Sequence, residues 1–196
     1  MAVFSAAWGK QMRFYQTIRI LPDALISAVF LRQQIWRQLH LILAENKTGE
    51  NDSAVAVAFP DYCREQQTAG NRLRLLAGDY SALESLAIAV RLSPFYPYIR
   101  LSPILPVPEK TQPVSYVRQH IKGVRRFQTA GAGRLFIPET LPFIWTQSLS
   151  GGRHHRPFPF FIRKLVPGTA AEGRFTCYGL SQKKSEDGRI ATVPHF

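Results

Sequence analysis

The sequence has few cysteines and no long apolar run. Its 196 residues include only two cysteines, Cys63 and Cys177, which are too few for a disulfide framework or for a metal site built from cysteines. No run of 18 apolar residues occurs, which argues against a transmembrane helix, and residues 1–15 lack the long apolar core of a signal peptide. We therefore expect a protein of the reducing cytoplasm.

Acidic residues are also scarce, with 13 Asp and Glu against 25 Lys and Arg and a formal net charge of +12. Residues 1–108 carry 11 basic and 8 acidic residues, a net +3, whereas residues 109–196 carry 14 and 5, a net +9. Such a field attracts polyanions, so nucleic acid is the first candidate partner. An anionic membrane is the second candidate. It is disfavoured, because the basic half contains no long amphipathic helix with an apolar anchoring face.

Residues 12–108 have the periodicities of alternating strands and helices. Apolar residues at steps of three and four predict one helix that opens at Pro22-Asp23 and runs through Glu45, and a second helix over 79–90. Strands are predicted at 12–21, 54–60, 72–78 and 98–108. The order β-α-β-β-α-β is that of the ferredoxin-like arrangement. Many unrelated functions share this fold, and RNA binding is a frequent one.

The second half of the chain is different in character. Strands are predicted at 141–150, 158–166, 173–181 and 190–196, with a charged turn at 181–189 and no internal repeat. The predicted fold class is therefore α+β. We expect a ferredoxin-like domain at 1–108, followed by a smaller, mostly β, basic domain at 109–196 that binds RNA.

Two adjacent histidines stand between two arginines in the segment GGRHHRPFPFF at 151–161. Zinc needs three or four ligands, adjacent strand residues point to opposite faces, and no Cys or carboxylate lies nearby, so a metal site is disfavoured. The remaining readings are a solvated loop tip or a loop that contacts phosphates. The residues in question are Arg153, His154, His155 and Arg156.

A second basic group lies in the segment PVSYVRQHIKGVRRFQTAGAGR at 113–134. Its members Arg118, Lys122, Arg125 and Arg126 are spaced so that they share one face of a helix, although Gly123 interrupts it. No acidic residue occurs between Lys110 and Ile137, so ion pairing within the segment is impossible. This favours contact with RNA phosphates over an ordinary solvated face, and Arg134 in the same segment is included among the expected contacts.

The strongest indication of function is a string of residues near the C-terminus, GRFTCYGLS at 173–181. Together with LPF and S-x-S within 141–150, FPFFIR at 158–163 and VP-x-F at 193–196, it resembles the CRISPR-associated endoribonuclease family of type I-F systems. The N-terminal half agrees in order, with RILPD after a strand, a helix containing RQLH and a strand ending in FPD. The resemblance covers nearly the whole chain.

The resemblance implies an enzyme that cuts the repeat hairpins of precursor CRISPR RNA on the 3′ side of the stem. It implies a ferredoxin-like N-terminal domain, a C-terminal domain that grips the hairpin, and no metal or other cofactor. The 2′-hydroxyl attacks the adjacent phosphate and leaves a 2′,3′-cyclic phosphate and a 5′-hydroxyl. The enzyme stays on its product and joins an RNA-guided surveillance complex, next to a backbone subunit.

The family's functional residues fall on identifiable positions of this chain. Its catalytic histidine falls on His40, its serine on Ser148, its tyrosine on Tyr178 and its stacking aromatic on Phe158. Each of the first three carries little weight alone, since a lone helix histidine is more often structural than catalytic. A histidine has a pKa suited to accepting or donating a proton near neutral pH, and the sequence leaves open which of the two His40 does.

Two other functions stay open. The chain could cap the 3′ hairpin of the guide without cleaving it, or it could be an unrelated RNA- or DNA-binding protein. One departure from the family concerns binding: the segment between Val114 and Leu141 is short and contains three glycines, where the family has an arginine-rich helix. The family's base-reading Arg and Gln fall on Tyr116 and Arg118, which indicates a different repeat or reliance on partner subunits.

Overall fold

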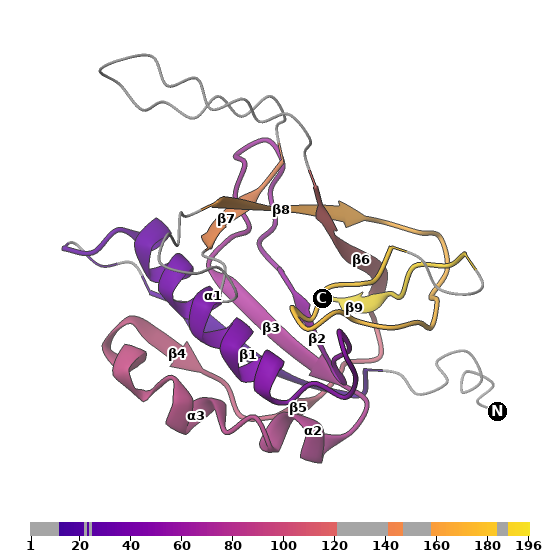
Figure 1. Ribbon diagram of the computed structural model, residues 1–196, viewed down its shortest axis with the longest axis horizontal. Coiled ribbons are helices and arrows are strands. Elements are labelled where there is room, and N and C mark those ends of the chain that lie inside the picture. Colours follow the sequence, from indigo (N-terminus) through magenta and orange to yellow (C-terminus); the bar gives the residue numbers. More distant parts are fainter. Residues whose placement is uncertain (1–11, 22, 24, 121–140, 147–157, 184–187) are drawn as a thin grey trace.

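The computed structural model describes residues 12–21, 23, 25–120, 141–146, 158–183 and 188–196. The described residues form two antiparallel sheets and a few helices, an α+β architecture (Figure 1). No helix among them is long and apolar enough to cross a membrane.

The first sheet has the strand order β2-β3-β1-β4, and β5 pairs with β1 beside β4. All of its pairings are antiparallel. Its strands are β1 (Phe14–Ile20), β2 (Val55–Ala58), β3 (Arg72–Ala77), β4 (Ile99–Leu101) and β5 (Leu105–Pro106). The strands predicted at 12–21, 54–60 and 72–78 are confirmed, and the extended segment at 98–108 contains β4 and β5.

Helix α1 (Ala28–Glu45) lies across one face of this sheet (Figure 1). The prediction that it opens at Pro22-Asp23 is wrong. Asp23 instead accepts hydrogen bonds from the backbone N–H groups of Leu25 and Ile26, which makes a separate turn, and the Ser27 hydroxyl caps the helix by accepting from the Val29 N–H. The buried side of α1 consists of Leu31, Ile35, Trp36, Leu39, His40, Ile42 and Leu43.

The predicted helix over 79–90 is also divided. The structure has α2 (Tyr80–Glu84) and α3 (Ile88–Arg91), with Ala87 between them in the left-handed region at φ 46°. Leu86 and Ile88 are both buried, and residues two apart cannot share one face of a continuous helix. The break lets both side chains reach the core. A 3₁₀ helix, η1 (Ser93–Tyr98), follows and leads into β4.

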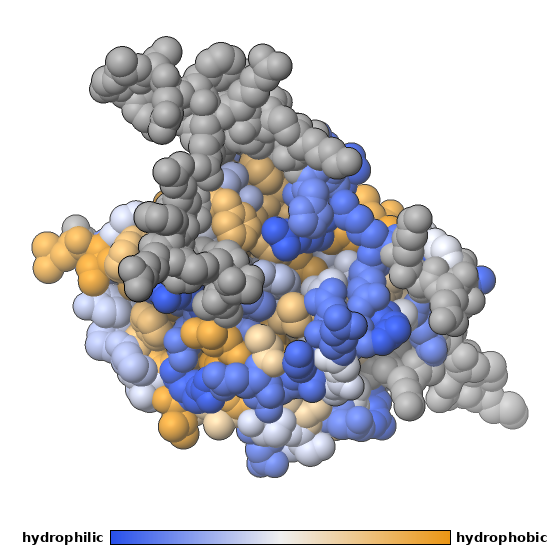
Figure 2. All heavy atoms as spheres, in the orientation of Figure 1, coloured by the Kyte–Doolittle hydropathy of each residue, from blue (hydrophilic) through white to orange (hydrophobic). Residues whose placement is uncertain are grey.

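The second sheet has the strand order β7-β8-β6-β9 and is antiparallel. Its strands are β6 (Gln112–Gln119), β7 (Phe143–Thr146), β8 (Phe158–Leu165) and β9 (Val193–His195). One hydrophobic cluster connects the two sheets and includes Trp36, Phe59, Phe160 and Val193. Apolar side chains stay exposed at the N-terminal end of α1, at Leu25, Val29 and Phe30, and Figure 2 shows both apolar and hydrophilic areas on this face of the molecule.

The predicted strand at 173–181 is wrong, because this segment forms a turn that connects the two sheets. The backbone N–H groups of Ser53 and Val57, at the β2 edge, donate to the carbonyls of Phe175 and Gly179, at 3.0 and 2.8 Å. The Ser181 N–H donates to the Tyr116 carbonyl of β6 at 2.8 Å. The alternation that indicated a strand instead reflects a turn whose buried residues, Phe175 and Leu180, face the core.

Gly179 is the residue that this turn depends on. Its φ is +71°, and a Cβ at this position would lie 2.5 Å from Val57 Cγ2 and 3.0 Å from the Val57 nitrogen. Only glycine combines the left-handed conformation with so close an approach to a neighbouring strand. The turn can therefore dock on β2 only with glycine at this position.

We predict that Gly179→Ala lowers the free energy of unfolding by about 2–4 kcal/mol, because it adds overpacking to a left-handed conformation. Gly188→Ala is the matched control, since Gly188 has φ +70° and nothing within 4 Å of the added Cβ. That variant should lose only about 1–2 kcal/mol. Urea unfolding of both variants measures the difference, and equal losses would contradict the account of the docked turn.

Candidate functional site

His40 lies on the buried side of α1, one helical turn after Trp36. Its side chain is 9% exposed, and its ring nitrogen Nδ1 has no hydrogen-bond partner among the described residues. The Trp36 Nε1 atom is likewise buried and unpartnered within the described part of the chain. Buried polar atoms without partners are rare in proteins. A histidine at this position is therefore not explained by packing alone, and we treat His40 as a candidate functional residue.

Tyr178 stands on the turn that docks on β2. The Gly179 N–H donates to the Thr176 carbonyl at 2.7 Å, and the Tyr178 N–H donates to the Thr176 hydroxyl at 3.3 Å, which fixes the turn. The ring of Tyr178 stacks on the imidazole of His40, with the ring centroids 3.7 Å apart and the planes at 11°. Residues 138 positions apart in the chain are thus brought face to face.

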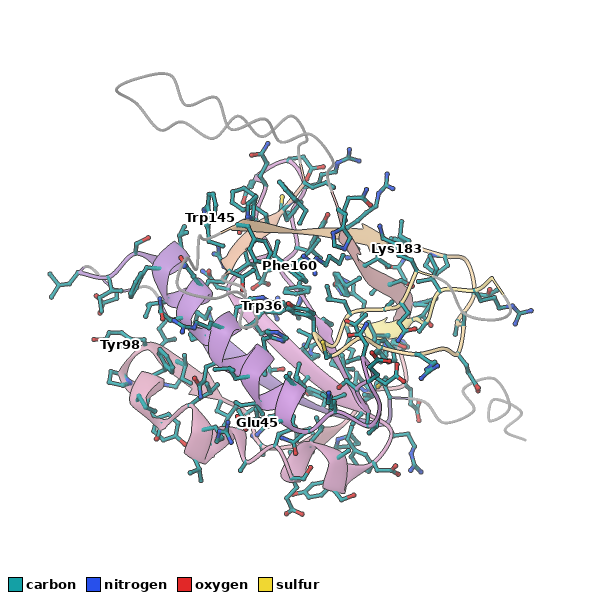
Figure 3. The ribbon with its side chains drawn as sticks, in the orientation of Figure 1. Trp36, Glu45, Tyr98, Trp145, Phe160 and Lys183 are labelled. Atoms are coloured by element: carbon teal, nitrogen blue, oxygen red, sulfur yellow. The ribbon has the colours of Figure 1, made fainter. Side chains whose placement is uncertain are left out.

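An aromatic cluster supports this stack from within the core. Trp36 contacts Phe59 and Phe160, with ring centroids 5.6 Å apart in both pairs, and Phe160 contacts Tyr178 at 4.8 Å. Figure 3 shows Trp36 and Phe160 together at the centre of the molecule, between α1 and β8. Close packing holds the Tyr178 ring in one orientation and, through it, the imidazole.

Arg118 places a positive charge beside the stack. Its guanidinium carbon lies 4.7 Å from the ring centroid of Phe160, 5.6 Å from that of Tyr178 and 5.8 Å from that of Phe158. The prediction that Arg118 shares a helix face with Lys122, Arg125 and Arg126 is wrong for Arg118, because it belongs to β6 and pairs with Ile162 of β8. The other three residues lie outside the described part of the chain.

The surroundings of His40 lower the pKa of its imidazole below the ordinary value. Burial is the largest cause, the positive charge of Arg118 acts in the same direction, and the nearby backbone of Cys177 opposes them. Burial disfavours the charged imidazolium because it removes water from the ion. His40 is therefore neutral at neutral pH and able to accept a proton.

A cavity of about 410 Å³ opens next to this stack. It is lined by polar and basic side chains from the end of β6, the loop before β2, the turn that carries Tyr178 and the two residues after that turn. They are Asn51, Arg118, His120, Thr176, Tyr178, Ser181, Gln182 and Lys183. Its size falls within the range of ligand pockets, about 300–1,000 Å³. The Asn51 side chain accepts from the Cys177 N–H at 3.4 Å, and the Gln182 amide donates to Asp52 at 2.7 Å.

Six residues of this cavity are not among the predicted site residues: Asn51, His120, Thr176, Ser181, Gln182 and Lys183. Thr176 and Ser181 belong to the FTCYGLS string itself. Gln182 and Lys183 directly follow the FTCYGLS string and could have been included for that reason. Asn51 comes from a polar loop and His120 from the end of a strand, and neither position carries a local signal. Lys183 is labelled in Figure 3, on the C-terminal segment beside β6.

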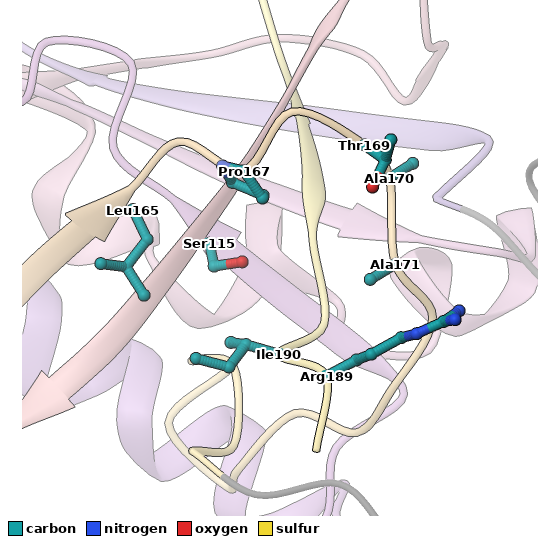
Figure 4. Close-up of a pocket in the computed structure, with 8 residues that line it drawn as sticks. All are labelled: Ser115, Leu165, Pro167, Thr169, Ala170, Ala171, Arg189 and Ile190. Atoms are coloured by element: carbon teal, nitrogen blue, oxygen red, sulfur yellow. The ribbon is translucent and has the colours of Figure 1, made fainter. Parts of the chain in front are cut away.

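A larger cavity, of about 550 Å³, lies elsewhere against the second sheet (Figure 4). Its lining is Ser115, Leu165, Pro167, Thr169, Ala170, Ala171, Arg189 and Ile190. Seven of these eight residues carry no charge, and none can accept a proton near neutral pH. Ser115 alternates along β6 with Tyr116, so the cavity faces away from the stack. The smaller cavity beside His40 is therefore the better candidate for chemistry.

The remaining predicted residues divide into two groups. Phe158 opens β8, is half-buried and lies within reach of Arg118. The others lie outside the described residues: Ser148, Lys122, Arg125, Arg126, Arg134, Arg153, His154, His155 and Arg156. Within the described residues, no three His, Cys, Asp or Glu side chains come together as a metal site would require.

Tyr116 occupies one of the two positions expected to read bases, and the structure does not place it where it could do so. Its side chain is 1% exposed, and its hydroxyl donates to the Phe59 carbonyl at 2.9 Å. Burial raises the pKa of this phenol, so it stays a neutral donor. Of the two positions, only Arg118 lines the cavity.

The chain is similar in sequence to a family of known proteins. Residues 15–196 match the family model described as CRISPR-associated protein (Cas_Csy4). The chain is 29% identical, over 206 residues, to the CRISPR-associated endonuclease Cas6/Csy4 of Escherichia coli (strain UTI89 / UPEC), covering 94% of this chain and all of that protein. It is 30% identical over 190 residues to the protein of the same name from Pseudomonas aeruginosa (strain UCBPP-PA14), covering 87% and 96%.

We predict that His40 titrates below pH 6.5, the ordinary histidine value, in the free protein. Arg118→Gln should raise this pKa, because it removes the nearby positive charge while burial is kept. Two-dimensional NMR of the imidazole resonances, assigned with a His40→Ala variant, measures both values. A His40 pKa at or above 6.5 in the folded wild type would show that burial and Arg118 do not control its protonation.

Proposed function

The chain belongs to the Cas_Csy4 family of CRISPR-associated proteins, and we propose that it is an endoribonuclease that cuts precursor CRISPR RNA within its repeats. The observation that supports this most strongly is the stack of His40 on Tyr178 beside Arg118. A neutral imidazole next to a fixed cation is suited to a reaction that moves a proton and develops negative charge. Both relatives described above are named as endonucleases.

The proposed reaction uses a hydroxyl of the RNA itself as the nucleophile. The 2′-oxygen forms a bond to the adjacent phosphorus while the bond from phosphorus to the 5′-oxygen breaks. The proton of the 2′-hydroxyl passes to a base, and the leaving 5′-oxygen receives a proton. The products are a 2′,3′-cyclic phosphate and a 5′-hydroxyl, with no water consumed.

His40 is the proposed base in this reaction. The lowered pKa of its imidazole keeps it neutral and ready to accept the proton of the 2′-hydroxyl. Tyr178 holds the imidazole in place by stacking on it. Ser148 is proposed to hydrogen-bond the attacking hydroxyl and to keep it in line with the leaving oxygen. The RNA then supplies the nucleophile, its 2′-hydroxyl, and the protein supplies the base, His40. The proposed reaction therefore needs no metal-activated water.

The binding part of the proposal rests on the charge of the chain. Most of the net charge of +12 lies beyond residue 108, so residues 109–196 are proposed to hold the hairpin, with Phe158 stacking near the cut site. Residues 1–108 are proposed to form the ferredoxin-like domain, which the order β2-β3-β1-β4 supports. The enzyme would keep its product and join a surveillance complex in the cytoplasm, beside a backbone subunit.

We predict that His40→Ala lowers the single-turnover rate of repeat cleavage by about 10²–10⁴-fold, the usual contribution of a general base. The dissociation constant for the hairpin should stay within a few-fold, because a neutral imidazole contributes little to phosphate binding. Gln38→Ala, two residues away on the same helix, is the control and should cleave normally. Melting curves of both variants check that the fold is kept.

The same assay tests the nucleophile. An RNA with 2′-deoxyribose at the cut site should bind normally and resist cleavage by the wild-type protein. Normal cleavage of the deoxy substrate would contradict the mechanism and, with it, the roles proposed for His40, Ser148 and Tyr178. A wild-type protein that binds the hairpin tightly and leaves every repeat intact would favour the alternative function, a subunit that caps the hairpin without cutting it.

We further predict that cleavage proceeds at an unchanged rate in excess EDTA. The nucleophile is a ribose hydroxyl and the base is His40, so chelation should remove nothing that the reaction needs. A time course with and without EDTA, at fixed ionic strength, measures this. Loss of activity in EDTA that Mg²⁺ or Zn²⁺ restores would contradict the proposal.

A further inference from the structure

Arg118 is held in an unusual way for a surface cation. Three aromatic rings, those of Phe158, Phe160 and Tyr178, lie within 5.8 Å of its guanidinium carbon. The described residues form four ion pairs between side chains, and Arg118 takes part in none of them. Packing against the rings fixes the guanidinium, while none of the described carboxylates pairs with its positive charge.

The guanidinium also lines the cavity of about 410 Å³ beside His40. Arg118 lines that cavity together with Tyr178, and the Tyr178 ring is the one that stacks on His40. Its charge acts on His40, Tyr178 and Cys177. A group bound in the cavity beside the stack therefore meets a cation that is already oriented.

The proposed reaction needs such a cation. As the 2′-oxygen approaches phosphorus, negative charge builds up on the two non-bridging oxygens of the phosphate. His40 is neutral before it accepts the proton, and the hydroxyls of Ser148 and Tyr178 are neutral throughout. A preorganised donor aimed at the developing charge is usually the largest single contribution to such catalysis.

Resting on the function proposed above, we propose that Arg118 is a catalytic residue, whose guanidinium binds a non-bridging oxygen of the scissile phosphate and stabilises the charge of the transition state. Arg118 exchanges no proton in this step. The 2′-proton still goes to the base, the 5′-oxygen still leaves with a proton, and the guanidinium keeps its charge. The aromatic rings hold it in place before the RNA arrives, so little reorganisation accompanies the reaction.

The test compares Arg118→Gln, Arg118→Lys and a matched control. The control is Arg163→Gln, which removes the same charge from an exposed residue of β8 that pairs with Val117, the neighbour of Arg118. Successive strand residues point to opposite faces, so Arg163 lies on the other face of the sheet. Single-turnover cleavage at saturating protein gives the rate of the chemical step, and titration with a 2′-deoxy hairpin gives the dissociation constant.

We expect Arg118→Gln to lower the saturated rate by about 10²–10³-fold, as loss of one transition-state donor does, with a change of only a few-fold in the dissociation constant. Arg118→Lys should recover part of the rate, because it restores the charge without the planar donor geometry. Arg163→Gln should keep the wild-type rate. A saturated rate of Arg118→Gln equal to that of the wild type, with weaker binding, would overturn the proposal and leave Arg118 as a binding residue.

Two further measurements separate catalysis from a structural role. Sulfur substitution of one non-bridging oxygen should slow the wild type more for one diastereomer than for the other, and Arg118→Gln should lose that difference. The pH at which the rate levels off should also rise in Arg118→Gln. Among the described residues, the groups that face His40 are Tyr178, the Cys177 backbone and Arg118, and of these Arg118 alone carries a charge.

The outcomes also distinguish this proposal from the one on which it rests. If the wild-type protein does not cleave repeat RNA, the proposed function fails. If the wild type cleaves and Arg118→Gln cleaves equally fast with an unchanged diastereomer preference, only the role of Arg118 fails. Arg118→Lys, which keeps a cation over the three rings, covers the case in which Arg118→Gln does not fold.

Discussion

The site depends on one constraint, the docking of the turn at 173–181 against both sheets. Backbone hydrogen bonds join this turn to β2 on one side and to β6 on the other. Gly179 allows the approach to Val57, where any side chain would collide. Because the turn is fixed at both edges, Tyr178 reaches the imidazole of His40 on α1 and lies beside Arg118 on β6. Three elements that are distant in sequence thus meet at one place.

The electrostatics of the site follow from this meeting. Burial under the turn and the charge of Arg118 both lower the pKa of His40, so the base is neutral when the substrate arrives. The same arginine has no carboxylate partner among the described ion pairs and is oriented by aromatic rings. The proton acceptor and the cation are therefore linked: burial is the main cause of the lowered His40 pKa, and the arginine that adds to it is also the one available to a phosphate. Neither property could be obtained from an isolated helix or strand.

Local patterns in the sequence predicted much of the fold. The periodic segments gave α1 and the strands β1, β2, β3, β7, β8 and β9, because alternation and three- to four-residue spacing reflect burial on one face. The turn at 173–181 was taken for a strand, since its buried residues alternate while its hydrogen bonds go to β2 and β6. Tertiary packing likewise divided the helix at Ala87. Arg118 was placed in a helix because its spacing to later basic residues fits one, whereas pairing with β8 makes it part of a strand.

The candidate site was predicted less evenly. His40 and Tyr178 were identified through the family resemblance, and the structure stacks them. Asn51 and His120 reach the cavity only through long-range contacts, which no local pattern encodes.

The most direct test of the whole account is the chemistry of the product ends, read by mass spectrometry of a cleaved repeat RNA. The account predicts a 2′,3′-cyclic phosphate on the upstream fragment and a 5′-hydroxyl on the downstream one. A 3′-hydroxyl paired with a 5′-phosphate would mean that water attacks instead, and would contradict it.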